Sequence, residues 1–118
     1  MAVEKDIVRI AGAIVGDRMY ADTAPANTPR PFGTYQQVGG RPLAFLESIQ
    51  PDLQNGRFQI SVWADTRQEA STLMRAIAKA MVEAPELRAE ALGNTIAQYD
   101  PVTELRGAIQ DFSIWFRD

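Results

Sequence analysis

A change of hydrophobic period near residue 65 constrains the fold of this chain more than any other feature. Over residues 57–64 apolar and polar side chains alternate, which predicts a strand whose buried face consists of Phe58, Ile60, Val62 and Ala64. Apolar residues then recur at helical spacing, at Ala70, Leu73, Met74, Ile77 and Met81. Thr66 and Glu69 have capping-box spacing and Pro85 ends the pattern, so a helix is expected directly after the strand.

The same two periods predict the remaining elements. Residues 3–15 favour a helix that ends at Gly16, with a narrow apolar stripe of Val3, Ile7, Ile10 and Ile14. Strands are expected at 18–20, at 32–38 with a resumption at 43–47, at 95–99 and at 108–117. Between them, prolines make residues 22–31 an extended connector, Gly39-Gly40 permits a bend or bulge, and residues 48–56 are typical of a hairpin tip.

These elements predict one α+β domain over residues 1–118. Their order along the chain is α-β-β-β-α-β-β, and neighbouring strands are joined by short connections. Such connections favour a mainly antiparallel sheet of four to five strands, with two helices packed on one face and a long protruding hairpin.

Composition excludes several classes of function. The chain has no cysteine and no histidine, which excludes disulfides, thiol nucleophiles, imidazole bases and the usual zinc sites. Its net charge is −3, so a strongly basic nucleic-acid footprint is absent, and no segment is typical of a targeting or membrane-spanning sequence. Asp100 and Glu104 are the nearest approach to a catalytic pair, and turn residues are the better interpretation. We therefore expect no catalytic residue, no metal and no cofactor.

Two tryptophans interrupt otherwise polar strand faces. Trp63 lies opposite the Phe58/Ile60/Val62 face of its strand, and Trp115 lies opposite Phe112/Ile114/Phe116. If the helices cover the apolar faces, both indoles lie on the other side of the sheet. Since a tryptophan buries a large area at low entropic cost, both are candidate contacts with another protein; the alternative is that a connector or the N-terminal helix covers them.

The predicted hairpin is a second candidate contact region. Its apolar residues lie in and beside a loop that contains proline, glycine and asparagine, where local burial is difficult; they include Phe45, Leu46, Ile49 and Leu53. An arm that reaches a neighbouring protein would bury them, and folding back on the domain would do so equally well.

Several short strings, taken in order, resemble one known family. They are Val15-Gly16-Asp17-Arg18-Met19-Tyr20, then Ala24-Pro25, Thr28-Pro29, Pro31-Phe32 and Tyr35-Gln36-Gln37-Val38-Gly39-Gly40, then Arg57 to Ala64 leading into Thr66 and Glu69-Ala70. The chain is similar over about residues 7–116 to small phage and prophage proteins of the tail-completion family, also called tail-terminator or head–tail joining proteins.

The resemblance implies a structural protein of the virion tail, assembled in the cytoplasm of a bacterial host, without catalysis or cofactor. Members of the family form a ring, commonly a hexamer, that caps the tail tube and meets the head-completion proteins. The partners implied are other copies of the chain, the tail tube protein and the head-completion or connector protein, with DNA only passing through the lumen and no membrane. A ring needs a heterologous contact between two different patches.

A second hypothesis comes from another class of protein. A small-molecule-binding α+β regulatory module would hold its ligand between the sheet and connector 22–31, in a deep closed pocket with converging polar groups. An enzyme that uses Asp100 or Glu104 is a minor third possibility.

Overall fold

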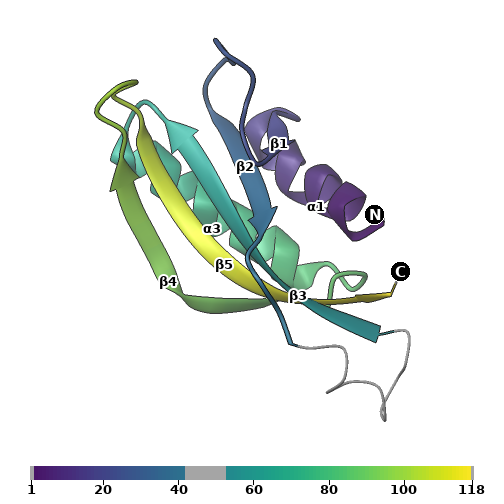
Figure 1. Cartoon of the computed structure of the whole chain (residues 1–118). Helices are drawn as coiled ribbons and strands as arrows, with labels where there is room; N and C mark the ends of the chain where they lie inside the picture. Colours follow the sequence, from purple (N-terminus) through teal and green to yellow (C-terminus); the bar gives the residue numbers. More distant parts are fainter. Residues whose placement is uncertain (1, 42–52, 118) are drawn as a thin grey trace.

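The computed structural model describes residues 2–41 and 53–117 of the chain. In chain order the elements are α1 (Ala2–Gly12), η1 (Ala13–Val15), β1 (Met19–Ala21), β2 (Phe32–Gln37), β3 (Leu53–Ala64), α3 (Arg67–Glu83), β4 (Glu90–Tyr99) and β5 (Arg106–Arg117). The predicted α+β class is confirmed, with two α-helices and five strands in the described part of the chain (Figure 1). The parts of the predicted hairpin at 43–47 and 48–52 lie outside the described residues.

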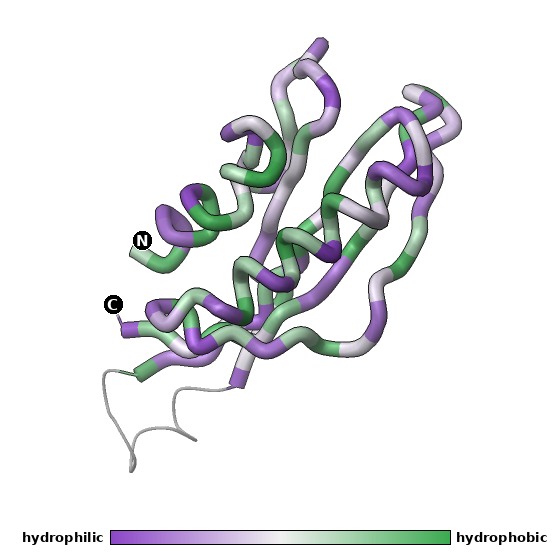
Figure 2. Tube along the Cα trace, turned by 180° about the vertical axis from the view of Figure 1, so that it is seen from behind, coloured by the Kyte–Doolittle hydropathy of each residue, from purple (hydrophilic) through white to green (hydrophobic). Residues whose placement is uncertain are grey.

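The five strands form one sheet in the order β1-β2-β3-β5-β4. All pairings are antiparallel except that of β1 with β2, which is parallel and makes the sheet mixed. Both helices pack on the same face of the sheet, as Figure 2 shows from the helical side. In the described part of the chain, the opposite face carries no helix (Figure 1).

The hydrophobic core lies between this sheet and the helices. On β3 and β5 the predicted faces are correct: Phe58, Ile60 and Val62 are almost fully buried, as are Phe112 and Ile114. From α3, the residues that pack into the core are Ala70, Met74, Ile77 and Met81. The predicted capping residue of this helix is also confirmed, because the Thr66 hydroxyl accepts a hydrogen bond from the Glu69 amide at 3.1 Å.

The N-terminal helix buries a different stripe from the one expected. Val3 and Ile7 are buried as predicted, but the stripe continues through Ala11 and Val15, while Ile10 and Ile14 are only partly buried. The buried positions follow a spacing of four residues from Val3 to Ala11 within α1, and Val15 continues it at the end of the 3₁₀ turn η1, just before Gly16.

Hydrogen bonds to neighbouring elements attach α1 to the domain. The Tyr35 hydroxyl on β2 donates to the Glu4 carboxylate at 3.3 Å, and burial, followed by the charge of Glu4, raises the pKa of Tyr35. Arg9 also lies 3.3 Å from Glu86, in the segment after α3.

Strands β3 and β4 begin four and five residues before their predicted limits. Residues 53–56 were expected in a hairpin tip, but they are the start of β3, where Asn55 faces β5 and donates to the Ser113 hydroxyl at 2.9 Å. Likewise β4 begins at Glu90 rather than Thr95. Its first half is interrupted by an irregularity between Leu92 and Ile96, where the buried Gln110 amide donates to the carbonyls of Leu92 and Gly93 at 3.0 and 3.1 Å.

A candidate interaction face on the open side of the sheet

The face without helices carries side chains in rows across four strands. Directly paired residues in antiparallel strands project on the same side, so the register defines each row. The first row is Phe32, Trp63, Gly107 and Gln98, and the second is Thr34, Ser61, Ile109 and Ile96. Ile96 is 64% exposed, which is unusual for isoleucine in a strand. The apolar side chains of these two rows, Phe32, Trp63, Ile96 and Ile109, form a patch that we call the Trp63 patch.

Gly107 allows Trp63 to lie flat against the sheet. A Cβ atom placed on Gly107 would be 2.8 Å from the Trp63 ring, closer than real Cβ contacts allow. Phe32 pairs with Trp63 on the other side. The indole is therefore fixed in position but only half-buried, and it remains part of the surface.

A polar row separates the Trp63 patch from the other end of the face. The Gln36 amide donates to Gln59 at 3.4 Å, and Gln59 donates to the Asp111 carboxylate at 3.1 Å. Arg57 completes the row with a 2.8 Å ion pair to the same carboxylate. Because these side chains hydrogen-bond to one another, their hydrogen-bonding groups already have partners within the subunit.

The second tryptophan lies beyond this polar row. Trp115 pairs with Asn55, and the Arg41 guanidinium carbon lies 5.9 Å from the centre of its ring, a cation–π distance. The Arg41 amide in turn donates to the Asn55 side chain at 3.0 Å. Trp115 is thus half-buried and in contact with residues that flank segment 42–52 of its own chain.

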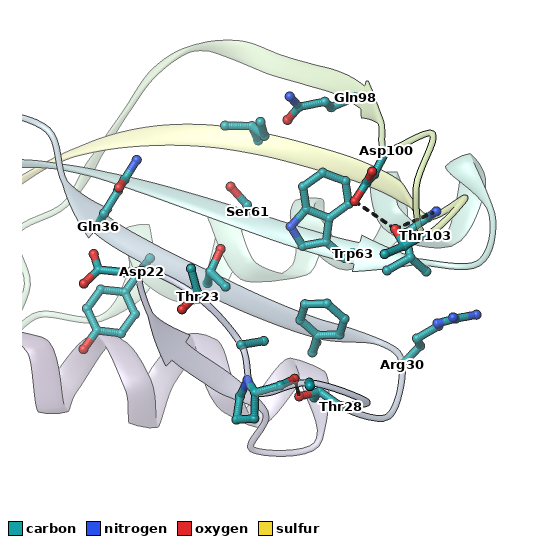
Figure 3. A pocket seen from close by; sticks show the side chains of 18 of the residues that line it. Asp22, Thr23, Thr28, Arg30, Gln36, Ser61, Trp63, Gln98, Asp100 and Thr103 are labelled. Carbon is teal, nitrogen blue, oxygen red and sulfur yellow. Dashed lines mark hydrogen bonds between the residues drawn. The ribbon is translucent and has the colours of Figure 1, made fainter.

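A cleft of about 660 Å³ lies over the Trp63 patch, as Figure 3 shows from close by. Its floor is the open face of the sheet, with Ser61, Trp63 and Ile109. Connector 22–31 forms one wall, and the turn between β4 and β5 forms the other. This is the place where the small-molecule hypothesis put its pocket, but the cleft is open on one side and not enclosed.

Both walls of the cleft are held by hydrogen bonds of their own. In the connector, the Thr28 hydroxyl donates to the carbonyl of Pro25. In the turn, the Asp100 carboxylate accepts from the Val102 amide and from the Thr103 hydroxyl, both at 2.9 Å. These hydrogen bonds hold the pKa of Asp100 below its ordinary value, and the bond from the Val102 amide has the largest effect. Asp100 is therefore a turn residue held as a carboxylate, as the sequence favoured.

Glu104 does not pair with Asp100 through its side chain in the described structure. Its backbone adopts a positive φ of 62° and its amide donates to the Asp100 carbonyl at 2.7 Å, so it closes the same turn. Among residues 2–41 and 53–117, no three acidic side chains lie together in a way that could hold a metal ion.

The predicted contact residues are distributed over the whole length of the molecule. Trp63 and Trp115 both lie on the open face, at opposite ends of it. Leu53 is the first residue of β3 and is largely buried within its own chain. Phe45, Leu46 and Ile49 lie outside the described residues.

The sequence analysis missed three members of the Trp63 patch. Phe32, Ile96 and Ile109 belong to it only through strand register, which pairs residues of these rows up to 48 positions apart, as Ser61 with Ile109. Alternation within the 108–117 strand assigned Ile109 to no apolar face, so no local signal identified it.

Three comparisons with known proteins bear on identity. The family described as "Tail completion protein gp17" matches residues 9–117. The solved structure of a chain from "Virion of native gene transfer agent (GTA) particle" has a TM-score of 0.61 and 19% identity, and the match covers 99% of this chain and 93% of that one. At this identity the likeness concerns the fold.

No curated protein matches the chain. No helix in the described residues is long and apolar enough to cross a bilayer. The family match spans nearly the whole sequence, including the β2, β3 and β5 strands that build the open face. The chain belongs to the family of the tail completion protein gp17, which makes it a structural protein of phage-type tails.

Proposed function

We propose that the chain is a tail terminator that forms a homo-oligomeric ring, caps the tail tube and joins it to the head-completion proteins. The observation that carries the proposal is the open sheet face: it belongs to a tail-completion fold and leaves Trp63 and Ile96 accessible. A structural role also accords with the bonding of Asp100, whose carboxylate is occupied by its own turn. The protein acts by assembly and not by catalysis.

Contacts in the ring are heterologous, so each copy must offer two different surfaces. The proposed contact residues are Trp63, Trp115, Phe45, Leu46, Ile49 and Leu53. The partners outside the ring are the tail tube protein and the head-completion or connector protein, and DNA passes through the lumen. A net charge of −3 suits a lumen through which DNA slides, since cationic walls would retain phosphates through counterion release. Assembly takes place in the host cytoplasm.

An open cleft favours a macromolecular ligand over the small-molecule alternative. Sites for small ligands bury most of the ligand in an enclosed pocket, whereas this cleft has an open side and two exposed walls.

Sedimentation at rising concentration, followed by negative-stain imaging with tail tubes of the same virus, tests the proposal. The native chain is expected to form closed rings at tube ends. Trp63→Ala and Trp115→Ala are expected to reduce ring formation strongly while the circular dichroism of the monomer stays native. Val82→Ala, at a half-exposed position of α3, is the matched control. Absence of rings both alone and on tubes would refute the proposal.

A further inference from the structure

We infer that the cleft over the Trp63 patch receives segment 42–52 of a second copy, so that the subunits join head to tail. The inference rests on the proposed function and identifies the two different surfaces that meet where neighbouring subunits of the ring contact each other. The cleft is the receiving surface, and the segment next to Trp115 is the inserted one.

The cleft and the segment lie at opposite ends of β3. The segment leaves the described structure at Arg41 and returns at Leu53, the first residue of the strand, whereas Trp63 is its penultimate residue. Ten residue steps separate Leu53 from Trp63, which is about 33 Å along a strand. The start of the segment is fixed beside Asn55, because the Arg41 amide donates to the Asn55 side chain. Asn55 is eight residue steps from Trp63, which is about 26 Å along the strand.

A copy therefore cannot place this segment on its own Trp63. To reach it, the chain would need to span about 26 Å outward and about 33 Å back along the strand. The twelve steps from Arg41 to Leu53 extend to about 43 Å at most, well short of both spans together. A segment 42–52 that covers Trp63 must therefore come from another molecule.

The chemistry of the two surfaces matches. Segment 42–52 has five apolar residues, Leu43, Ala44, Phe45, Leu46 and Ile49, and only two charged ones, Glu47 and Asp52. The floor of the cleft presents uncharged side chains, namely Phe32, Thr34, Ser61, Trp63 and Ile109. Apolar residues in a low-charge segment gain most from burial against such a floor.

The two tryptophans therefore differ in role. Trp115 lies under Arg41 of its own chain, at the base of the segment. Trp63 lies in the cleft, between two walls that are held by their own hydrogen bonds. A contact that runs from the base of one copy to the cleft of the next is heterologous, and repeated copies generate a ring when the rotation closes.

Disulfide trapping tests the inference directly, because the chain contains no cysteine of its own. Full-length Ser61→Cys and Ile49→Cys proteins are mixed at high concentration and oxidised, and the products are separated on a non-reducing gel. The expected result is a mixed disulfide dimer at least tenfold more abundant than with Ser71→Cys, a half-buried serine of α3, in place of Ser61→Cys. Ring formation is measured on the same samples.

A second pair of cysteines detects the alternative in which segment 42–52 contacts its own copy. Ser113 lies on the same face as Ser61 but opposite Arg57, within reach of the segment of its own copy. An intramolecular disulfide in the Ile49→Cys/Ser113→Cys chain, without mixed product at Ser61→Cys, would overturn the inference. If rings form without the mixed product, the inference fails and the proposed function stands. If the mixed product forms in dimers or filaments but never in rings, the contact stands and the ring does not.

Discussion

The two faces of the central strands differ in what surrounds them. On the helix side, Phe58 and Phe112 are 1% and 0% exposed and belong to the hydrophobic core. On the open side, their strand neighbours Gln59 and Asp111 bond to each other, and Trp63 lies half-buried beyond them. The same strands thus stabilise the monomer with one face and leave the other available for association. From this difference we expect fold and assembly to depend on separate sets of residues, and substitutions can test that separation.

The largest effect is expected from the helix-covered face. Phe112→Ala removes a fully buried ring and leaves a cavity, so the free energy of unfolding should fall by about 3–5 kcal/mol. Chemical denaturation of the monomer measures this change. The half-buried Trp63→Ala should cost clearly less in the same assay; an equal loss from both would mean that the open face also supports the monomer.

An intermediate effect is expected where Trp63 lies on Gly107. In Gly107→Ala, the new methyl group would meet the indole at 2.8 Å, and overpacking of this kind costs about 1–3 kcal/mol. In a Trp63→Ala background the same substitution should cost almost nothing, because the clash is gone. A double-mutant cycle by thermal unfolding measures the coupling, and additive effects would contradict the described packing.

The smallest effect concerns Asp100 in the wall of the cleft. Its pKa is lowered in the folded state, so its stabilising hydrogen bonds are fully present above the ordinary value of 3.8 and are lost as the pH falls through the lowered pKa. Unfolding of native and Asp100→Asn chains, compared from neutral pH to well below 3.8, should show a difference that shrinks as the pH falls. A difference that grows on acidification would contradict this assignment.

Sequence patterns predicted the helices and strands that are specified by residues close together in the sequence. The strand 57–64 and the helix after Thr66 each carry a regular period and a clear boundary. Both were found with their predicted buried faces, except that Leu73 is only partly buried. The tryptophans were likewise placed on the open face by alternation alone.

Long-range contacts explain what sequence patterns missed. Asn55-Gly56 has the composition of a turn, yet Asn55 is held in β3 by Ser113, 58 residues away. Gly93 and Asn94 also suggest a turn, but they belong to β4, whose irregularity is held by Gln110. For the candidate site, Trp63 was identified, and the small-molecule hypothesis placed a pocket between the sheet and connector 22–31. The second wall, from residues 98–105, was not predicted, because only the sheet register brings it to the same place.

The close approach of Gly40 to Asn55 has a consequence for how the sequence of such a protein could change in evolution. A Cβ atom on Gly40 would be 2.1 Å from the Asn55 carbonyl oxygen, and its positive φ of 147° also favours glycine, so the chain crosses β3 there at close quarters. Together with the bond between the Arg41 amide and Asn55, this crossing fixes where segment 42–52 departs. Lengthening a loop between fixed ends costs little, about 0.6 kcal/mol for each doubling. The eleven residues of segment 42–52 could therefore change in sequence or length to fit a different binding partner, while the strands keep their register.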